Sequence, residues 1–276
     1  MTKLCRCIFL AILICPLLTA AQKLEKIWET DTIFKVPESV LYDAGKKQLY
    51  VSNIEGASGA KDGKGSISTL NADGKIINLG WATGLHAPKG MAMYKKVLYV
   101  ADVDAVVGFD AKTGKEVARF AIDGAKFLND LTVDDKGNLF VSDSETGLIH
   151  KISDGKPEVF IEKRTRPNGV LWYNNLLYFV NAGAFFRQNQ DGSITEIARG
   201  MESSTDGIEP LGNNNFLVSS WIGAIYYIKN DGTVKELLNT KAQKINSADI
   251  GYNAKKKVVY VPTFAGNRVV AYKLEE

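Results

Sequence analysis

The chain has 276 residues, of which 45% are hydrophobic and 24% are charged, and its formal net charge is +3. This length and apolar content are enough to build a sizeable hydrophobic core. The small net charge, with no long run of Lys or Arg, argues against a nucleic-acid partner or an anionic membrane surface.

Residues 1–21 have the layout of a secretory signal peptide. A positive start with Lys3 and Arg6 precedes an apolar run over residues 8–18, and small residues lead to Gln22. The apolar run is shorter than the roughly 20 residues that span a bilayer comfortably, although a retained N-terminal anchor is the alternative interpretation. We therefore expect a secreted or periplasmic protein whose mature chain has no membrane span.

All three cysteines lie within this expected leader. The mature chain then has neither disulfides nor a thiol nucleophile, and its stability must come from its core. It also lacks a Gly-x-Ser-x-Gly elbow and a phosphate-binding loop, so the sequence does not support a serine esterase or a nucleotide hydrolase.

Six segments repeat one pattern, which is a short apolar strand, a polar turn and a strongly β-prone strand. They begin at Pro37, Pro88, Leu128, Pro167, Thr205 and Ser247, so that successive starts are 51, 40, 39, 38 and 42 residues apart. Repeats of this length are typical of propeller blades. Residues 128–161 show a whole unit, in which Asp- and Gly-containing turns separate four apolar runs and predict antiparallel strands.

We predict an all-β fold, a six-bladed β-propeller of four-stranded antiparallel blades, as a single domain over residues 22–276. The last unit is too short after residues 269–274 to supply a fourth strand, whereas residues 24–34 are β-prone and precede the first unit. We expect this N-terminal strand to complete the last blade and so remove the open edges. The Gly- and Lys-rich loop at residues 53–66 is either a tolerated insertion or a lid over a site.

In a propeller, the residues that open the innermost strands meet at one mouth of the central channel. In this chain they are Glu38, Lys89, Asn129 with Asp130, Asn168, Asp206 and Asp249. Turn preference alone favours Asn and Asp at such positions. Converging carboxylate and amide oxygens are also the ligands that a hard cation such as Ca²⁺ prefers.

Other residues near this mouth leave alternatives open. Phe185, Phe186 and Trp221 form either an apolar wall around a ligand or ordinary packing between blades. His86 is a second candidate for a base, and His150 is expected to be structural. With two separated histidines and no cysteine, a zinc site lacks its usual ligands.

The motifs PES, LND, RPNGVLW and STDGIE, in this order and spacing, resemble those of the senescence-marker-protein-30/gluconolactonase family. The resemblance covers essentially the whole mature chain. It implies a six-bladed propeller with a divalent metal in its channel and a lactonase or related esterase activity. Position by position, it implies that Glu38, Asn168 and Asp206 bind the metal and that Asp206 is also the general base.

Asn129 resembles a polar residue beside the family's metal, and Asp130 resembles a substrate contact. Lys89 and Trp221 join them as candidate substrate contacts because they lie at the same mouth. Lys89 is also the main departure from the family, since an ammonium group in the channel repels a dication. It therefore either points away, contacts the substrate or replaces the metal.

Two further departures concern neighbouring positions. Phe127 lies two residues before Asn129, where the family often has Arg, and Ser39 follows Glu38 in place of Gly. The sequence thus supports two functions. The first is a metal-dependent hydrolase, monomeric, with Ca²⁺ or else Zn²⁺ or Mn²⁺, that opens a lactone or related cyclic ester of a sugar acid. The second is a non-catalytic propeller that binds a small ligand or a protein at the same mouth.

Overall fold

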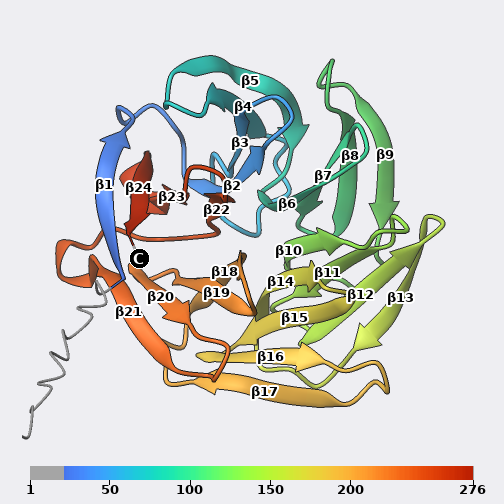
Figure 1. Cartoon of the computed structure of the whole chain (residues 1–276). Helices are drawn as coiled ribbons and strands as arrows, with labels where there is room; N and C mark the ends of the chain where they lie inside the picture. Colours follow the sequence, from blue (N-terminus) through green and yellow to red (C-terminus); the bar gives the residue numbers. More distant parts are fainter. Residues whose placement is uncertain (1–21, 276) are drawn as a thin grey trace, which may run out of the picture.

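The computed structural model of this chain describes residues 22–275, and the leader expected at residues 1–21 lies outside this range. The described part contains 24 β-strands and two short 3-10 turns, η1 (Lys241–Gln243) and η2 (Phe264–Gly266). The strands form six four-stranded sheets, arranged as blades around a central channel (Figure 1). The predicted six-bladed propeller is therefore confirmed.

Each of the first three blades is an antiparallel meander that runs outward from the channel. The first contains β2 (Pro37–Asp43), β3 (Gln48–Asn53), β4 (Gly65–Asn71) and β5 (Ile76–Leu85). The second contains β6 (Pro88–Tyr94), β7 (Val97–Asp102), β8 (Ala105–Asp110) and β9 (Glu116–Ala121). The third contains β10 (Leu128–Val133), β11 (Leu139–Asp143), β12 (Leu148–Ser153) and β13 (Lys156–Ile161).

The next two blades repeat this order, and the sixth departs from it. The fourth contains β14 (Pro167–Tyr173), β15 (Leu176–Asn181), β16 (Ala184–Gln188) and β17 (Ile194–Arg199). The fifth contains β18 (Thr205–Gly212), β19 (Asn215–Ser220), β20 (Ala224–Ile228) and β21 (Val234–Asn239). The sixth contains β22 (Gly251–Asn253), β23 (Val258–Pro262), β24 (Val269–Glu275) and, from the other end of the chain, β1 (Lys23–Glu29).

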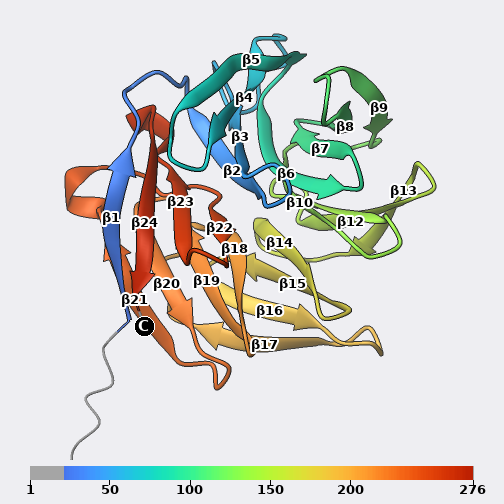
Figure 2. The same cartoon turned by 45° about the horizontal axis from the view of Figure 1, so that its top comes forward.

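The N-terminal strand closes the ring, as the sequence predicted. β1 pairs antiparallel with β24, and Leu24 lies opposite Leu274 while Trp28 lies opposite Ala271. Figure 2 shows β1 beside β24 at the outer edge of the sixth blade. Beyond the strand, the amide of Thr30 donates to the carbonyl of Val269 at 3.0 Å. The two ends of the chain are thus held together by backbone pairing.

The turns within blades follow from local side-chain chemistry, as the connection between β10 and β11 illustrates. One carboxylate oxygen of Asp134 accepts hydrogen bonds from the amides of Lys136 and Asn138, at 2.9 and 2.8 Å. Gly137 follows in the left-handed region, with φ of 92°. The Asp carboxylate accepts hydrogen bonds from backbone amides of the turn, and Gly adopts positive φ without steric cost. The chain therefore reverses its direction here.

The hydrophobic core lies between neighbouring blades and not at the channel. One cluster joins Tyr178 and Phe185 of the fourth blade to Phe216 and Tyr226 of the fifth. Tyr50 of the first blade packs in the same way with Leu98 of the second. Each blade is therefore stabilised by its neighbours on both sides, and the ring must be complete for the core to be complete.

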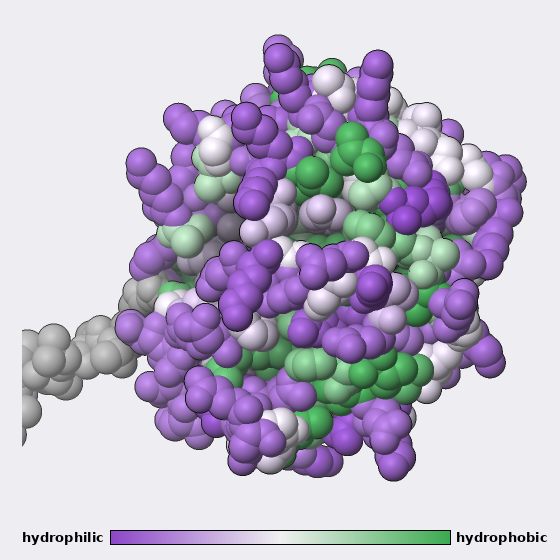
Figure 3. Space-filling model, turned by 90° about the vertical axis from the view of Figure 1, so that its right-hand side faces the viewer, coloured by the Kyte–Doolittle hydropathy of each residue, from purple (hydrophilic) through white to green (hydrophobic). Residues whose placement is uncertain are grey.

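The outer surface is mainly polar. Figure 3, viewed from the side of β9 and β13, shows hydrophilic side chains over most of this face, with smaller hydrophobic areas between them. The exposed apolar residues include Val117 of β9 and Val159 of β13, both on outer strands. Across residues 22–275, no helix has the length and apolar character needed to span a bilayer.

Removal of β1 tests the closure of the ring. A chain that starts at Thr30 leaves the edge of β24 unpaired, and we expect it to lose about 3 kcal/mol or more, which lowers Tm by roughly 6–12 °C for a domain of this size. The exposed edge should also promote association between chains. The measurements are thermal unfolding and size-exclusion chromatography, with a chain that starts at Gln22 as the control. Equal Tm values and equal elution would contradict the inferred role of β1.

Candidate active site

The site is built by bulges at the start of five inner strands. In β2, β6, β10, β14 and β18, the pairing with the second strand skips one residue of the inner strand close to its beginning. A bulge leaves the extra residue outside the ladder and redirects its side chain. These are the positions of the residues that the sequence placed at the channel mouth.

Serines on the second strands accept hydrogen bonds from the amides that the bulges remove from the ladder. The amide of Asp130 donates to the hydroxyl of Ser142 at 3.0 Å, and the amide of Gly207 donates to Ser219 at 2.9 Å. The amide of Ser39 makes the same contact with Ser52 in the first blade. A buried amide without a partner is costly, so these serines stabilise the distorted backbone that carries the site.

Glycines at the bulges allow the inner strands to approach one another. A Cβ on Gly169 would lie 2.0 Å from the carbonyl oxygen of Asp206. A Cβ on Gly90 would lie 2.1 Å from a carboxylate oxygen of Asp130, and one on Gly207 would lie 2.2 Å from Asp249. Such distances are far below van der Waals contact, so only Gly fits at these positions.

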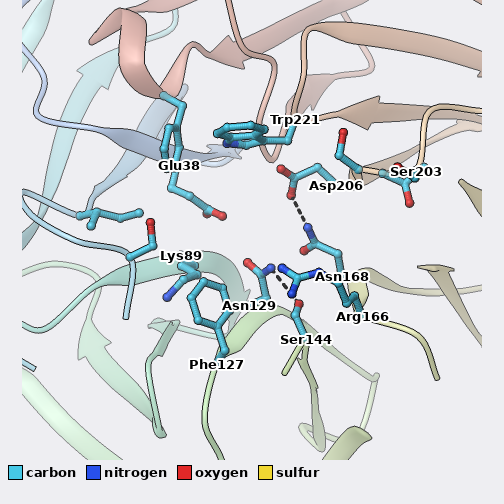
Figure 4. Close-up of a pocket in the computed structure, with 15 residues that line it drawn as sticks. Glu38, Lys89, Phe127, Asn129, Ser144, Arg166, Asn168, Ser203, Asp206 and Trp221 are labelled. Carbon is cyan, nitrogen blue, oxygen red and sulfur yellow. Dashed lines mark hydrogen bonds between the residues drawn. The ribbon is translucent and has the colours of Figure 1, made fainter. Parts of the chain in front are cut away.

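Six of the predicted site residues line one cavity of about 340 Å³ (Figure 4). They are Glu38, Lys89, Asn129, Asn168, Asp206 and Trp221. The first five come from the inner strands of the first five blades, and Trp221 follows β19. Residues as far apart in sequence as Glu38 and Trp221 therefore share one pocket.

Asp130 and Asp249 do not line this cavity but a second one of about 220 Å³, together with Ser39 and Glu209. The carboxylate of Asp130 accepts the amides of Leu131 and Val170, at 2.7 and 2.8 Å, and so joins the third blade to the fourth. Asp249 accepts the hydroxyl of Ser39. Because the bulge turns consecutive residues in different directions, Asn129 and Asp130 line different cavities, and Asp130, a predicted substrate contact, does not line the cavity that contains Asn129.

Glu38, Asn129, Asn168 and Asp206 form the part of the cavity that we call its floor. Two hydrogen bonds orient the side-chain amides of Asn129 and Asn168 there. Nδ2 of Asn168 donates to Asp206 at 3.0 Å. The hydroxyl of Ser144 donates to the carbonyl of Pro167, so its contact with Asn129 at 3.0 Å must be one in which Nδ2 of Asn129 is the donor. In both residues the amide nitrogen donates a hydrogen bond to the protein, and the amide oxygen accepts none from the described chain.

The free oxygens fit a hard cation. Oε2 of Glu38, Oδ1 of Asn129 and Oδ1 of Asn168 are buried and have no hydrogen-bond partner among the described residues. With the carboxylate of Asp206, they give a donor set of oxygens only, which suits Ca²⁺ better than zinc. No group of three or more His, Cys, Asp or Glu side chains with metal-binding geometry occurs in residues 22–275, so the two amides are essential to such a site.

The carboxylates of the floor lie in an unfavourable environment for negative charge. Burial raises the pKa of Glu38 well above its ordinary value, and repulsion by Asp206 and Asp249 adds to the rise, while Lys89 opposes it. Burial also raises the pKa of Asp206, with repulsion by Asp249 in addition and the hydrogen bond from Asn168 opposing it. A proton or a cation at this floor would relieve the repulsion.

Lys89 is 1% exposed and turns away from the floor. Its ammonium group donates to the carbonyl of Ala87 at 2.9 Å and lies 4.3 Å from the centre of the Phe127 ring. Burial lowers the pKa of Lys89 to about 8, although Glu38, Asp102 and Asp143 favour its charged form. Phe127 thus provides the cation–π partner of Lys89.

The aromatic wall of the cavity differs from the one considered from the sequence. Trp221 is 40% exposed and meets Phe264 edge to face, with ring centres 5.4 Å apart. Phe185 lies in the core between blades, and Phe186 stacks on Phe179, so neither lines the pocket. Packing is therefore the correct interpretation for Phe185 and Phe186.

Other lining residues were not named as site residues from the sequence, although the loop at residues 53–66 was considered as a lid. Ile54 and Ser58 show that the loop at residues 53–66 forms part of the wall, and Arg166 reaches the cavity from the loop before β14. His86 is absent from the lining, and its Nδ1 accepts the amide of Gly63 at 3.2 Å. The motif RPNGVLW contained Arg166, but only the position of its loop shows that it faces the pocket.

No protein-family model and no curated protein matches this chain. Solved structures match its fold. A streptogramin B lyase superposes with a TM-score of 0.69 at 15% identity, over 92% of this chain and 98% of that one. A virginiamycin B lyase from Staphylococcus aureus has a TM-score of 0.68 at 13% identity, over 92% and 100%.

A gluconolactonase from Xanthomonas campestris also superposes, with a TM-score of 0.65 at 13% identity, over 88% of this chain and 87% of that one. At such identities the likeness shows the shared six-bladed fold alone. The residues in the channel of this chain must therefore carry any argument about its activity.

Gly169→Ala tests the close approach that forms the floor. The new methyl group meets the backbone of Asp206, and we expect a loss of about 1–3 kcal/mol in the free energy of unfolding. Gly80→Ala is the matched control, because its Cβ would lie 3.6 Å from Thr83, an ordinary contact. Its effect should stay within about 0.5 kcal/mol. Denaturant unfolding measures both, and equal stabilities would show that the inner strands can separate.

Proposed function

We propose that this chain is an exported, metal-dependent hydrolase that opens a lactone or a related cyclic ester at the mouth of the channel. The observation that carries this proposal is the meeting of oxygen donors from four inner strands in one cavity. Three of these oxygens, Oε2 of Glu38 and Oδ1 of Asn129 and of Asn168, are buried and have no hydrogen-bond partner in the described chain. The motifs that resemble the gluconolactonase family lie at these same positions.

Glu38, Asn129, Asn168 and Asp206 would hold the cation, and Ca²⁺ is the first candidate because every donor is an oxygen. When bound, the cation would supply positive charge that polarises a substrate carbonyl and stabilises the oxyanion that develops from it. Mn²⁺ and Zn²⁺ are the alternatives. Export is proposed from the composition of residues 1–21.

Asp206 is proposed as the general base. Its hydrogen bond with Asn168 engages Oδ1 and leaves the second carboxylate oxygen to accept a proton from water. Ser144 accepts the hydrogen bond of the Asn129 amide group and thereby leaves the amide oxygen of Asn129 available to the cation. Trp221 and Phe264 shield one side of the cavity from solvent and offer a flat apolar surface to a substrate ring.

Metal binding should stabilise the wild-type protein. A cation at about 100 times its Kd adds about 2.7 kcal/mol, which raises Tm by roughly 5–11 °C. Asp206→Asn and Glu38→Gln should each abolish most of this rise, whereas Asp123→Asn, at an exposed carboxylate, should preserve it. Differential scanning fluorimetry with Ca²⁺, Mn²⁺ and Zn²⁺ measures the rise in Tm. For each variant, the Tm with metal is compared with the Tm of the same variant in chelator. No response of the folded wild-type protein to any of the three would refute the metal site.

Hydrolysis is tested by pH-stat titration over a set of aldonolactones. We expect turnover that Asp206→Asn lowers by about 10²–10⁴-fold, as the loss of a general base does, and that Asn168→Ala also lowers. Asp123→Asn should keep wild-type rates. A metal response without turnover of any lactone would contradict the hydrolase and support the alternative, a propeller that binds a ligand at this mouth without catalysis.

A further inference from the structure

The cations around the pocket differ in what they contact. Lys89 is buried against Phe127, and its ammonium group donates a hydrogen bond to the carbonyl of Ala87. Arg166 is exposed and lies at the rim, two residues before Asn168, as Phe127 lies two residues before Asn129. Figure 4 shows Arg166 reaching from its loop toward the middle of the pocket, whereas the ammonium group of Lys89 lies at the side of Phe127.

The guanidinium group of Arg166 makes no ion pair or hydrogen bond with any residue of the described chain, although it borders a cavity with two carboxylates. The other five arginines in residues 22–275 all have such a partner: Arg119 with Glu116, Arg164 with the carbonyl of Glu162, Arg187 with Asn189, Arg199 with Glu196, and Arg268 with Glu29. Among the arginines of residues 22–275, Arg166 therefore has the guanidinium group without a partner, and this residue lines the pocket.

The rest of the rim offers polar groups next to an aromatic wall. The hydroxyls of Ser58 and Ser203 line the cavity and make no hydrogen bond within the described chain. Trp221 and Phe264 present their rings from the neighbouring side. A ligand with a ring and several hydroxyl groups would match these surfaces.

We infer that the substrate of this pocket carries a carboxylate group besides its reactive ester, and that Arg166 recognises this carboxylate at the rim. The inference rests on the proposed function for the reactive ester. An anionic substrate approaching Glu38 and Asp206 meets repulsion that a cation at the entrance offsets. The planar guanidinium group binds a carboxylate through two parallel hydrogen bonds, and its single charge balances a single carboxylate.

The test compares two substrates that differ at one carbon. The monolactone of a hexaric acid carries a free carboxylate, whereas the matching hexonic lactone has a hydroxymethyl group there. We expect the wild-type protein to prefer the carboxylate-bearing lactone by about tenfold or more in kcat/KM, mainly through KM, because a hydrogen bond to a charged group contributes this much. The preference should shrink at 1 M salt, since the rim is exposed.

Arg166→Gln should remove the preference, because it should lower kcat/KM for the carboxylate-bearing lactone about tenfold more than kcat/KM for the neutral lactone, and Arg166→Lys should restore part of the preference. Arg164→Gln is the matched control, because Arg164 lies on the same loop but does not line the cavity, and it should keep the preference. Equal use of both lactones by the wild-type protein, or equal losses for both in Arg166→Gln, would overturn the inference while the proposed hydrolase stands.

Binding separates the two proposals. Isothermal titration calorimetry of both lactones with Asp206→Asn gives dissociation constants that do not depend on turnover. If neither lactone is hydrolysed by the wild-type protein, a tenfold tighter binding of the carboxylate-bearing lactone that Arg166→Gln abolishes would support the inference although the hydrolase fails. The absence of that difference in binding would overturn it.

Discussion

The one-residue bulge at the start of five inner strands is the constraint on which the site depends. A regular strand would turn alternate side chains to opposite faces, toward the packed interiors between blades. The bulge breaks this alternation at the channel and directs two consecutive residues toward it. Serines on the second strands keep the displaced amides bonded, and Gly90, Gly169 and Gly207 give the next strand room to approach.

This arrangement concentrates groups that are unfavourable for stability. Burial raises the pKa of both Glu38 and Asp206, and Asp206 adds to the rise at Glu38, while Lys89 is buried without an ion pair in the described chain. The stabilising contacts lie elsewhere, in the apolar clusters between blades and in the pairing of β1 with β24. A stable ring thus supports a strained polar centre, a division of roles that is common at functional sites.

The fold does not choose the chemistry. Propellers that superpose on this chain are described as a gluconolactonase and as streptogramin B lyases, so one scaffold hosts more than one activity. What distinguishes this chain is the set of side chains at its bulges and rim. The ammonium group of Lys89 contacts the Phe127 ring, whereas the guanidinium group of Arg166, from a different blade, has no partner in the described chain.

The sequence by itself determined the number of blades, their antiparallel strands and the closure by the N-terminal strand, because repeat length, β-prone runs and turn residues are local signals. It also identified Glu38, Asn129, Asn168 and Asp206 as residues that meet. Only the tertiary structure decided that Asp130 lines a different cavity from Asn129, since the bulge in β10 changes the direction of successive side chains.

The aromatic residues show the same limit. Phe185 and Trp221 are both aromatic residues near the ends of second strands, yet Phe185 packs between blades and Trp221 borders the pocket. Likewise, Arg166 differs from the other five arginines in residues 22–275 in that its guanidinium group makes no ion pair or hydrogen bond within this part of the chain. Whether a side chain is buried, paired or free depends on what the neighbouring blade places beside it, and that contact exists only once the ring has closed.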